Sequence, residues 1–319
     1  MSHRIAKASL TFVLAGLALA ASASVEYQAA SGAAPQPRPR AQPLSAAELT
    51  EFIDGTMAIQ LDAKPAAGAT ISVVKDGALL LAKGYGYADV EKRVPVDAEQ
   101  TLFRPGSTSK LFTWTAVMQL VEQGKLDLDA DVNTYLKDFQ IPQTYPEPVT
   151  LRNLLTHTAG FEDGGLGYLI ARSEKDLAPL GDFLELHMPA RIRAPTKDFA
   201  SGVNASYSNW GTALAGHIVA TVTGMDFDEY IERHIYQPLG MTSSSFREPL
   251  PPGLRERMSN GYRFKNGRFE KHDFEFIHNF GPAGSMSTTA TDMAKFMLAH
   301  LNGGALGEAR ILKPETAQL

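Results

Sequence analysis

The sequence predicts an α+β fold in which a small antiparallel sheet lobe joins a large helical lobe. Two observations predict it. Two apolar runs separated by a hairpin signal lie near the start of the ordered region, and helical patterns with few strand patterns fill the middle of the chain. Strands and helices are therefore segregated along the chain, which is typical of α+β folds and not of alternating α/β folds.

The composition is that of a globular protein. The 319 residues include 30 Lys and Arg against 35 Asp and Glu, a net charge of −5, and 44% hydrophobic residues. This mildly acidic balance argues against a nucleic-acid partner, whose electrostatic binding needs clustered basic residues. Because the chain has no cysteine, disulfides, thiolate nucleophiles and Cys-ligated metals are excluded.

The first 44 residues are predicted to lie outside the fold. Residues 1–23 combine a basic start, an almost entirely apolar run and a small-x-small end, as in a cleaved signal peptide. The apolar run is shorter than the roughly 20 residues that span a bilayer, which disfavours an uncleaved anchor. Residues 24–44, rich in Ala and Pro, predict a flexible linker. We therefore expect a periplasmic or secreted bacterial protein whose folded domain spans 45–319.

The ordered region is predicted to open with a helix and a hairpin. A capping box starts at Ser45, and apolar residues then recur at helical spacing until just before Pro65. Apolar runs over 70–74 and 78–86 flank a Lys-Asp-Gly turn, which is a strong hairpin signal.

The rest of the chain is predicted to be mainly helical. A second hairpin is expected over 261–276, turning at Asn266-Gly267. Helical patterns occupy six segments: 107–123, 151–155, 182–187, 211–223, 228–236 and 291–301.

A serine and a lysine stand at the start of the first of these six helices. Ser107 follows a Pro-Gly turn, and Lys110 comes three residues later on the same helical face. The helix is apolar on nearly every side, so we expect it to be buried. Burial lowers the pKa of Lys110 from its free value of about 10.4, which makes Lys110 a candidate base for the Ser107 proton. A second Ser-x-x-Lys, at Ser72, lies on a predicted strand, where the two side chains point to opposite faces.

The motif Tyr207-Ser208-Asn209 occurs once, in a predicted loop just before a helix. Its small middle residue lets a phenol and a carboxamide point into one cleft. Tyr207 is then a candidate for proton transfer to a leaving group or from water, and Asn209 for positioning Lys110 or a substrate amide. Taken alone, such a tyrosine would more often pack on the core.

Together these segments resemble the serine β-lactamase and penicillin-binding-protein-like hydrolases, in the class C β-lactamase-related branch that includes D,D-carboxypeptidases, D-aminopeptidases and esterases. Tyr-x-Asn, in place of Ser-Asp-Asn, selects this branch. Further segments resemble the family in the same order: 103–110, 124–129, 154–161, 237–241 and 282–288.

The resemblance implies a β-lactamase/transpeptidase-like fold and a covalent acyl-enzyme on Ser107. Lys110 and Tyr207 would be catalytic, Asn209 would bind substrate, and no cofactor or metal would be needed. Which of Lys110 and Tyr207 is the base in each step stays open. The Ser107 N–H would be one oxyanion donor.

The family completes its site with a Lys-x-Gly or His-x-Gly motif on a strand near the C-terminus. We identify no such segment here, and we assign residues 157–160, which read His-Thr-Ala-Gly, to a structural loop. We therefore expect a partial sequence that lacks the C-terminal strands, with apolar edges exposed on the first hairpin.

The predicted function is that of an exported serine hydrolase acting on an ester, an amide or a β-lactam, with a small molecule or a peptide such as a peptidoglycan peptide as substrate. The alternative is an impaired or truncated member that binds a peptidoglycan peptide or a β-lactam without turnover. Membrane contact is expected only through an uncleaved signal or a missing C-terminal region.

Overall fold

The computed structural model describes residues 45–63, 65–163, 170–196 and 205–319. The predicted signal peptide and linker lie outside these residues. Within them, no helix is both long enough and apolar enough to cross a membrane.

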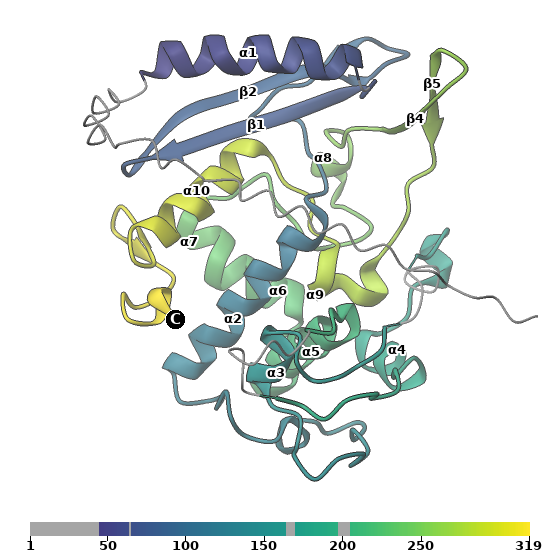
Figure 1. Cartoon of the computed structure of the whole chain (residues 1–319), viewed down its shortest axis with the longest axis vertical. Coiled ribbons are helices and arrows are strands. Elements are labelled where there is room, and N and C mark those ends of the chain that lie inside the picture. Colours follow the sequence, from purple (N-terminus) through teal and green to yellow (C-terminus); the bar gives the residue numbers. More distant parts are fainter. Residues whose placement is uncertain (1–44, 64, 164–169, 197–204) are drawn as a thin grey trace, which may run out of the picture. The chain divides into compact units, whose positions relative to one another are not determined.

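The first layer is a helix on an antiparallel hairpin, as predicted (Figure 1). Its elements are α1 (Ala46–Ala63), β1 (Gly68–Lys75), β2 (Ala78–Asp89) and the short β3 (Val94–Pro95), in the sheet order β1-β2-β3. The capping box is present, because Ser45 Oγ accepts from the Glu48 N–H at 3.2 Å and the Glu48 carboxylate accepts from the Ser45 N–H at 2.9 Å. Asp76 and Gly77 have φ values of 50° and 76°, the left-handed turn that suits a two-residue hairpin.

The other face of the hairpin packs on α10 (Ala290–Leu301), and most of the remaining helices lie beyond α10 (Figure 1). The remaining helices are α2 (Lys110–Glu122), α3 (Leu151–Leu155), α4 (Leu180–Leu186), α5 (Asn209–Thr223), α6 (Phe227–Ile231), α7 (Gln237–Leu239), α8 (Pro252–Arg255) and α9 (Gly281–Gly284). Two further hairpins are β4 (Gly261–Lys265) with β5 (Arg268–His272), and β6 (Ala305–Leu306) with β7 (Ala309–Arg310).

All six predicted helical segments are helical in the structure, but three details differ. The helix of the Tyr-x-Asn segment begins at Asn209, so Asn209 belongs to α5 and not to the loop before it. The segment at 228–236 passes from α6 into a π-helical turn over Glu232–Tyr236. The prediction that α2 is buried on nearly every side holds for Phe112 but not for Leu111, which is 51% exposed.

The central core forms around α2 and α5, which pack directly against each other. From Trp210 to Val219 every residue of α5 is buried. Trp210 is fully buried and donates its indole N–H to the Leu184 carbonyl at 3.0 Å, which ties α5 to α4. The N-terminal ends of α2 and α5 are therefore held by dense packing, and the candidate site lies at these ends.

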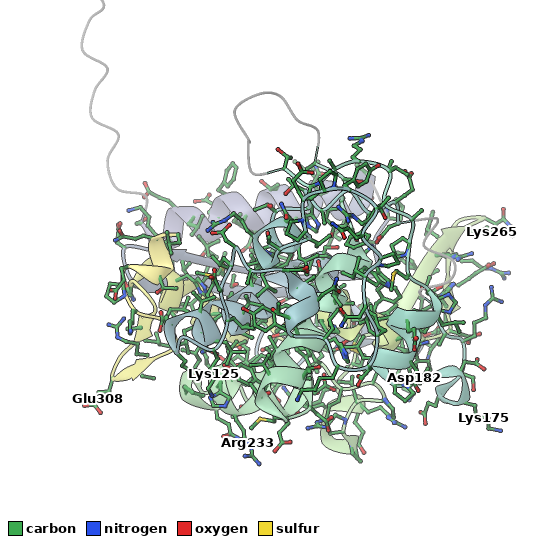
Figure 2. All side chains as sticks on the ribbon, turned by 90° about the horizontal axis from the view of Figure 1, so that it is seen from below. Lys125, Lys175, Asp182, Arg233, Lys265 and Glu308 are labelled. Atoms are coloured by element: carbon green, nitrogen blue, oxygen red, sulfur yellow. The ribbon has the colours of Figure 1, made fainter. Side chains whose placement is uncertain are left out.

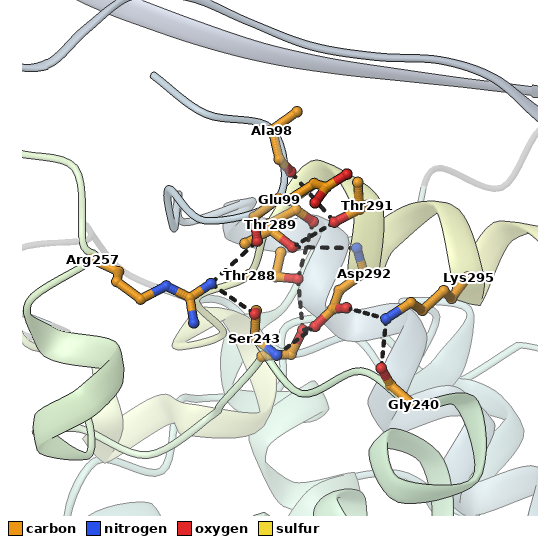
Figure 3. Close-up of polar contacts among 11 residues, drawn as sticks. Ala98, Glu99, Gly240, Ser243, Arg257, Thr288, Thr289, Thr291, Asp292 and Lys295 are labelled. Carbon is orange, nitrogen blue, oxygen red and sulfur yellow. Dashed lines mark hydrogen bonds and ion pairs between the residues drawn. The ribbon is translucent and has the colours of Figure 1, made fainter. Parts of the chain in front are cut away.

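A buried polar network joins α10 to the loop after α7 (Figure 3). The carboxylate of Asp292, only 2% exposed, accepts hydrogen bonds from the Ser243 N–H at 2.7 Å, Ser244 Oγ at 2.9 Å and Lys295 Nζ at 2.8 Å. Ser244 Oγ also bonds to Thr288 Oγ1 at 2.8 Å, and Thr288 exchanges backbone hydrogen bonds with Phe103. The network thus supports the strand-like segment that leads into Ser107.

Candidate active site

Ser107 and Lys110 lie at the junction of a 3₁₀ turn, η1 (Gly106–Ser109), with α2. Gly106 has a φ of 57°, a conformation that favours glycine, and the chain turns there into the helix. Side chains three residues apart lie almost above one another in a 3₁₀ turn. As a result Lys110 Nζ is 3.2 Å from Ser107 Oγ, as the sequence predicted.

Lys110 is buried, and every hydrogen of its ammonium group has an acceptor. Besides Ser107 Oγ, Nζ contacts Asn209 Oδ1 at 2.8 Å and the Ala283 carbonyl oxygen at 2.7 Å. Burial lowers the pKa of Lys110 to about 8, although the negative charge of Asp163 opposes the shift. A lysine with this pKa is partly neutral near physiological pH and can accept a proton.

Tyr207 approaches Ser107 from the α5 side. Its hydroxyl donates to Ser107 Oγ at 2.7 Å, and Lys110 Nζ lies 4.9 Å from the centre of its ring. The residue is 51% exposed, so its phenol faces solvent from which a substrate can enter. The structure thus brings together all four residues predicted from the sequence: Ser107, Lys110, Tyr207 and Asn209.

Asp163 also supports the site, and the sequence analysis did not single it out. Its carboxylate accepts hydrogen bonds from Ser208 Oγ at 2.7 Å, from the Trp210 N–H at 3.0 Å and from the Asn209 N–H. The carboxylate therefore satisfies N–H groups at the start of α5 and interacts favourably with the helix dipole. A capping residue that lies 46 positions before the helix has no local sequence signal.

His157 lies in the segment that the sequence assigned to a structural loop and not to the third motif. The structure instead places its imidazole against the Tyr207 ring, with centroids 4.4 Å apart. Its Nδ1 accepts a hydrogen bond from the Ser208 N–H at 3.2 Å. Burial and the charge of Lys110 lower the pKa of His157 to about 4, so the ring is neutral at pH 7. The only sequence feature that pointed to His157 was its place in the segment 154–161, which resembles the family.

Two segments have the letters of the third family motif, contrary to the prediction that none is present. The first, Lys75-Asp76-Gly77, is the turn between β1 and β2. The second, Lys265-Asn266-Gly267, forms the turn between β4 and β5, where Asn266 and Gly267 have φ values of 51° and 76°. Figure 2 shows Lys265 at the periphery, at the tip of this hairpin. We therefore assign neither turn a part in the site.

Arg104, three residues before Ser107, borders a cavity of about 590 Å³. Its guanidinium pairs with the buried Glu248 carboxylate at 3.1 Å and lies 4.9 Å from the Phe274 ring centre. Further wall residues come from α8 and the β4–β5 hairpin. The cavity thus flanks the segment that leads into Ser107, while the four candidate site residues are not among those that line it. Among the described residues, no group of three or more His, Asp or Glu could hold a metal ion.

Comparison with known proteins identifies the family. Residues 50–319 match the family model described as Beta-lactamase. The chain belongs to the β-lactamase family. This confirms the resemblance derived from the sequence, and the α+β fold agrees with it.

Solved structures of this family share the fold. One is the octameric penicillin-binding protein homologue from Pyrococcus abyssi, with 26% identity, a TM-score of 0.70, and coverage of 84% of this chain and 59% of that one. Another is the D-amino acid amidase from Ochrobactrum anthropi SV3, with 26% identity, a TM-score of 0.67, and coverage of 85% and 73%.

A curated relative from Bacillus subtilis (strain 168), named "Putative penicillin-binding protein PbpX", is 30% identical over 239 residues, which cover 73% of this chain and 55% of the relative. "Protein flp" of Staphylococcus aureus (strain N315) is 29% identical, over 74% of this chain and 45% of its own length. This β-lactamase family chain therefore spans about half the length of the curated relatives that it matches.

Proposed function

We propose that the protein is an exported serine hydrolase that forms a covalent acyl-enzyme on Ser107 and hydrolyses an ester, an amide or a β-lactam. The observation that carries this proposal is the convergence on one atom. Ser107 Oγ is contacted by Lys110 Nζ at 3.2 Å and by the Tyr207 hydroxyl at 2.7 Å. A hydroxyl between two proton-transfer groups is the arrangement that activates a serine nucleophile.

Acylation follows from the neutral state of Lys110. A neutral amine keeps two N–H groups, which Asn209 Oδ1 and the Ala283 carbonyl accept, and its lone pair then faces Ser107 Oγ. As Ser107 Oγ attacks the substrate carbonyl carbon, its proton moves to Lys110 Nζ. The Ser107 N–H lies in the first turn of η1, where a helix leaves N–H groups without intrahelical partners, and can donate to the oxyanion.

Collapse of the tetrahedral intermediate breaks the bond to the leaving group, which takes a proton from the Tyr207 hydroxyl. Tyr207 regains a proton from Lys110, whose ammonium lies near its ring. In deacylation a water attacks the acyl carbon, its proton passes to Tyr207 or Lys110, and Ser107 Oγ leaves with a proton returned by the same pair. Asn209 holds Lys110 in place throughout.

The substrate class is proposed from the chemistry and from the relatives. The structural relatives include a D-amino acid amidase and a penicillin-binding protein homologue. We therefore include D-amino-acid amides and peptides, such as peptidoglycan peptides, and β-lactams among the candidates. Export rests on the predicted signal peptide over residues 1–23, and intact mass of the mature protein tests it through cleavage after Ala23.

Covalent labelling tests the proposed function. A fluorophosphonate probe or a fluorescent penicillin is expected to label the wild type but not Ser107→Ala. Ser72→Ala, which changes the other Ser-x-x-Lys on β1, is the matched control and should label normally. Nitrocefin, a short acyl nitrophenyl ester and a D-alanyl peptide then rank the substrates. Labelling without turnover would favour a binding protein, and a folded chain that no probe labels would contradict the proposal.

A further inference from the structure

We propose that His157 is a positioning residue for Tyr207, holding the phenol oxygen on Ser107 with a neutral imidazole. The inference rests on the proposed function of Ser107. His157 does not contact Ser107 in the structure's hydrogen-bond network; it acts through the tyrosine and its two neighbours in the chain.

His157 binds the backbone on both sides of Tyr207. The Ser206 N–H donates to the His157 carbonyl oxygen at 2.8 Å, and the Ser208 N–H donates to His157 Nδ1 at 3.2 Å. A backbone N–H can donate only to a ring nitrogen that carries a lone pair, so this contact requires Nδ1 without a proton. The Tyr207 backbone is thus held at both flanks by one residue in one protonation state.

The imidazole also supports the tyrosine ring. Tyr207 is 51% exposed, so packing covers only part of it, and His157 lies 4.4 Å from it with the ring planes 34° apart. His157 in turn forms a T-shaped ring pair with Trp114, with centroids 5.9 Å apart, and Trp114 donates its indole N–H to the Leu155 carbonyl at 2.7 Å. Trp114 stands one turn after Lys110 on α2, so His157 packs between the helix that carries Lys110 and the Tyr207 ring.

The backbone at His157 supports a role for the side chain. Its φ of 57° lies in the left-handed region, which residues with a Cβ rarely adopt. Such a conformation at a site contact is a reason to look for function. The titratable groups around the ring are Tyr207, Lys110 from α2, and Asp163 through Ser208. The charge of Lys110 helps to keep the imidazole neutral.

A double-mutant cycle tests the proposal with the rate of acylation by a fluorescent penicillin, whose amide nitrogen must be protonated to leave. His157→Asn removes the ring and tolerates the left-handed backbone. We expect it to slow acylation on the order of 10- to 100-fold in the wild type, the scale of a misplaced catalytic group. In the Tyr207→Phe background, which lacks the hydroxyl, His157→Asn should lower the acylation rate by less than about 2-fold. His272→Asn, on the β4–β5 hairpin, is the matched control.

The positioning role would be overturned if His157→Asn slowed acylation equally in the wild type and in Tyr207→Phe, or did not slow it in the wild type. A second readout needs no activity and covers the case in which penicillin does not acylate the wild type. The readout is the NMR signal of the Tyr207 ring in protein with isotope-labelled tyrosine, assigned through its loss in Tyr207→Phe. Its chemical shift should change in His157→Asn and stay the same in His272→Asn. An unchanged Tyr207 signal would refute the inference, whereas failure of fluorophosphonate labelling at Ser107 would refute the proposed function alone.

Discussion

The layer around α2 and α5 and the layer of α1 with β1–β2 are packed very differently. In α5 an unbroken run of residues is buried, whereas α1 buries only Leu49 along its length, and no residue of β1 is fully buried. Phe52 and Ile59 of α1 are each 67% exposed. All four residues of the candidate site come from the densely packed layer or from the turns that enter it.

This difference shows what the site needs. The proposed proton transfer between Ser107, Lys110 and Tyr207 requires positions held within a fraction of an ångström, and side chains at the ends of well-packed helices meet that requirement. The α1–β1–β2 layer supports the helical layer through α10 and carries none of these four side chains. Substitutions of the same type in the two layers should therefore differ widely in their effects on the rate of acylation and on the free energy of unfolding.

The largest contrast is expected between two lysines. Lys110→Met keeps most of the stem but removes the amine, and acylation should fall on the order of 100- to 10,000-fold, the usual contribution of a general base. Lys83→Met in β2 removes an exposed ion pair with Asp54 at 2.8 Å and should leave the rate unchanged. Stopped-flow labelling with the fluorophosphonate measures both, and a Lys110→Met protein that labels at the wild-type rate would contradict the assignment.

Two phenylalanines give the corresponding contrast in stability. Phe112 in α2 is fully buried, with its ring stacked on Phe296 at 3.9 Å, so Phe112→Ala should lower the free energy of unfolding by about 3–5 kcal/mol. Phe52→Ala on α1 should change it by less than about 0.5 kcal/mol. Urea unfolding followed by circular dichroism compares the two variants, and similar losses would disprove the difference in packing.

The pH dependence of the acylation rate tests whether Lys110 is the base. Its pKa is lowered to about 8 by burial, and only the neutral amine accepts the Ser107 proton. The rate should therefore rise with pH, reach half its maximum near pH 8 and then level off. A lysine side chain free in water would instead titrate at about pH 10.4. A midpoint near 10, or a rate that falls over this range, would exclude Lys110 as the base.

The smallest expected effect concerns two aspartates. The charge of Asp163 raises the pKa of Lys110, so Asp163→Asn should move the midpoint of the pH profile to a lower pH. The variant also weakens the cap of α5 and should cost about 1 kcal/mol of stability. Asp54→Asn, the counterpart in α1, should leave the profile unmoved. A midpoint that moves to higher pH in Asp163→Asn would show that the charge of Asp163 does not raise the pKa of Lys110.

Local signals made much of the architecture predictable. The capping box at Ser45, the left-handed turn at Gly77 and the pairing of Ser107 with Lys110 all involve residues within four positions of one another. Their geometry follows from the helix or turn that contains them, which sequence patterns specify directly. The family resemblance then indicated which distant segments belong to the same site.

The sequence by itself determined the fold class, the main helices and hairpins, and the four candidate residues. Only the tertiary structure decided that the Ala283 carbonyl binds Lys110, that Asp163 caps α5 and that His157 packs against Tyr207. A main-chain oxygen has no signature in the sequence, and the two side chains reach partners 45 to 51 residues away. Such contacts exist only once packing has brought separate segments together, because no local periodicity or spacing encodes them.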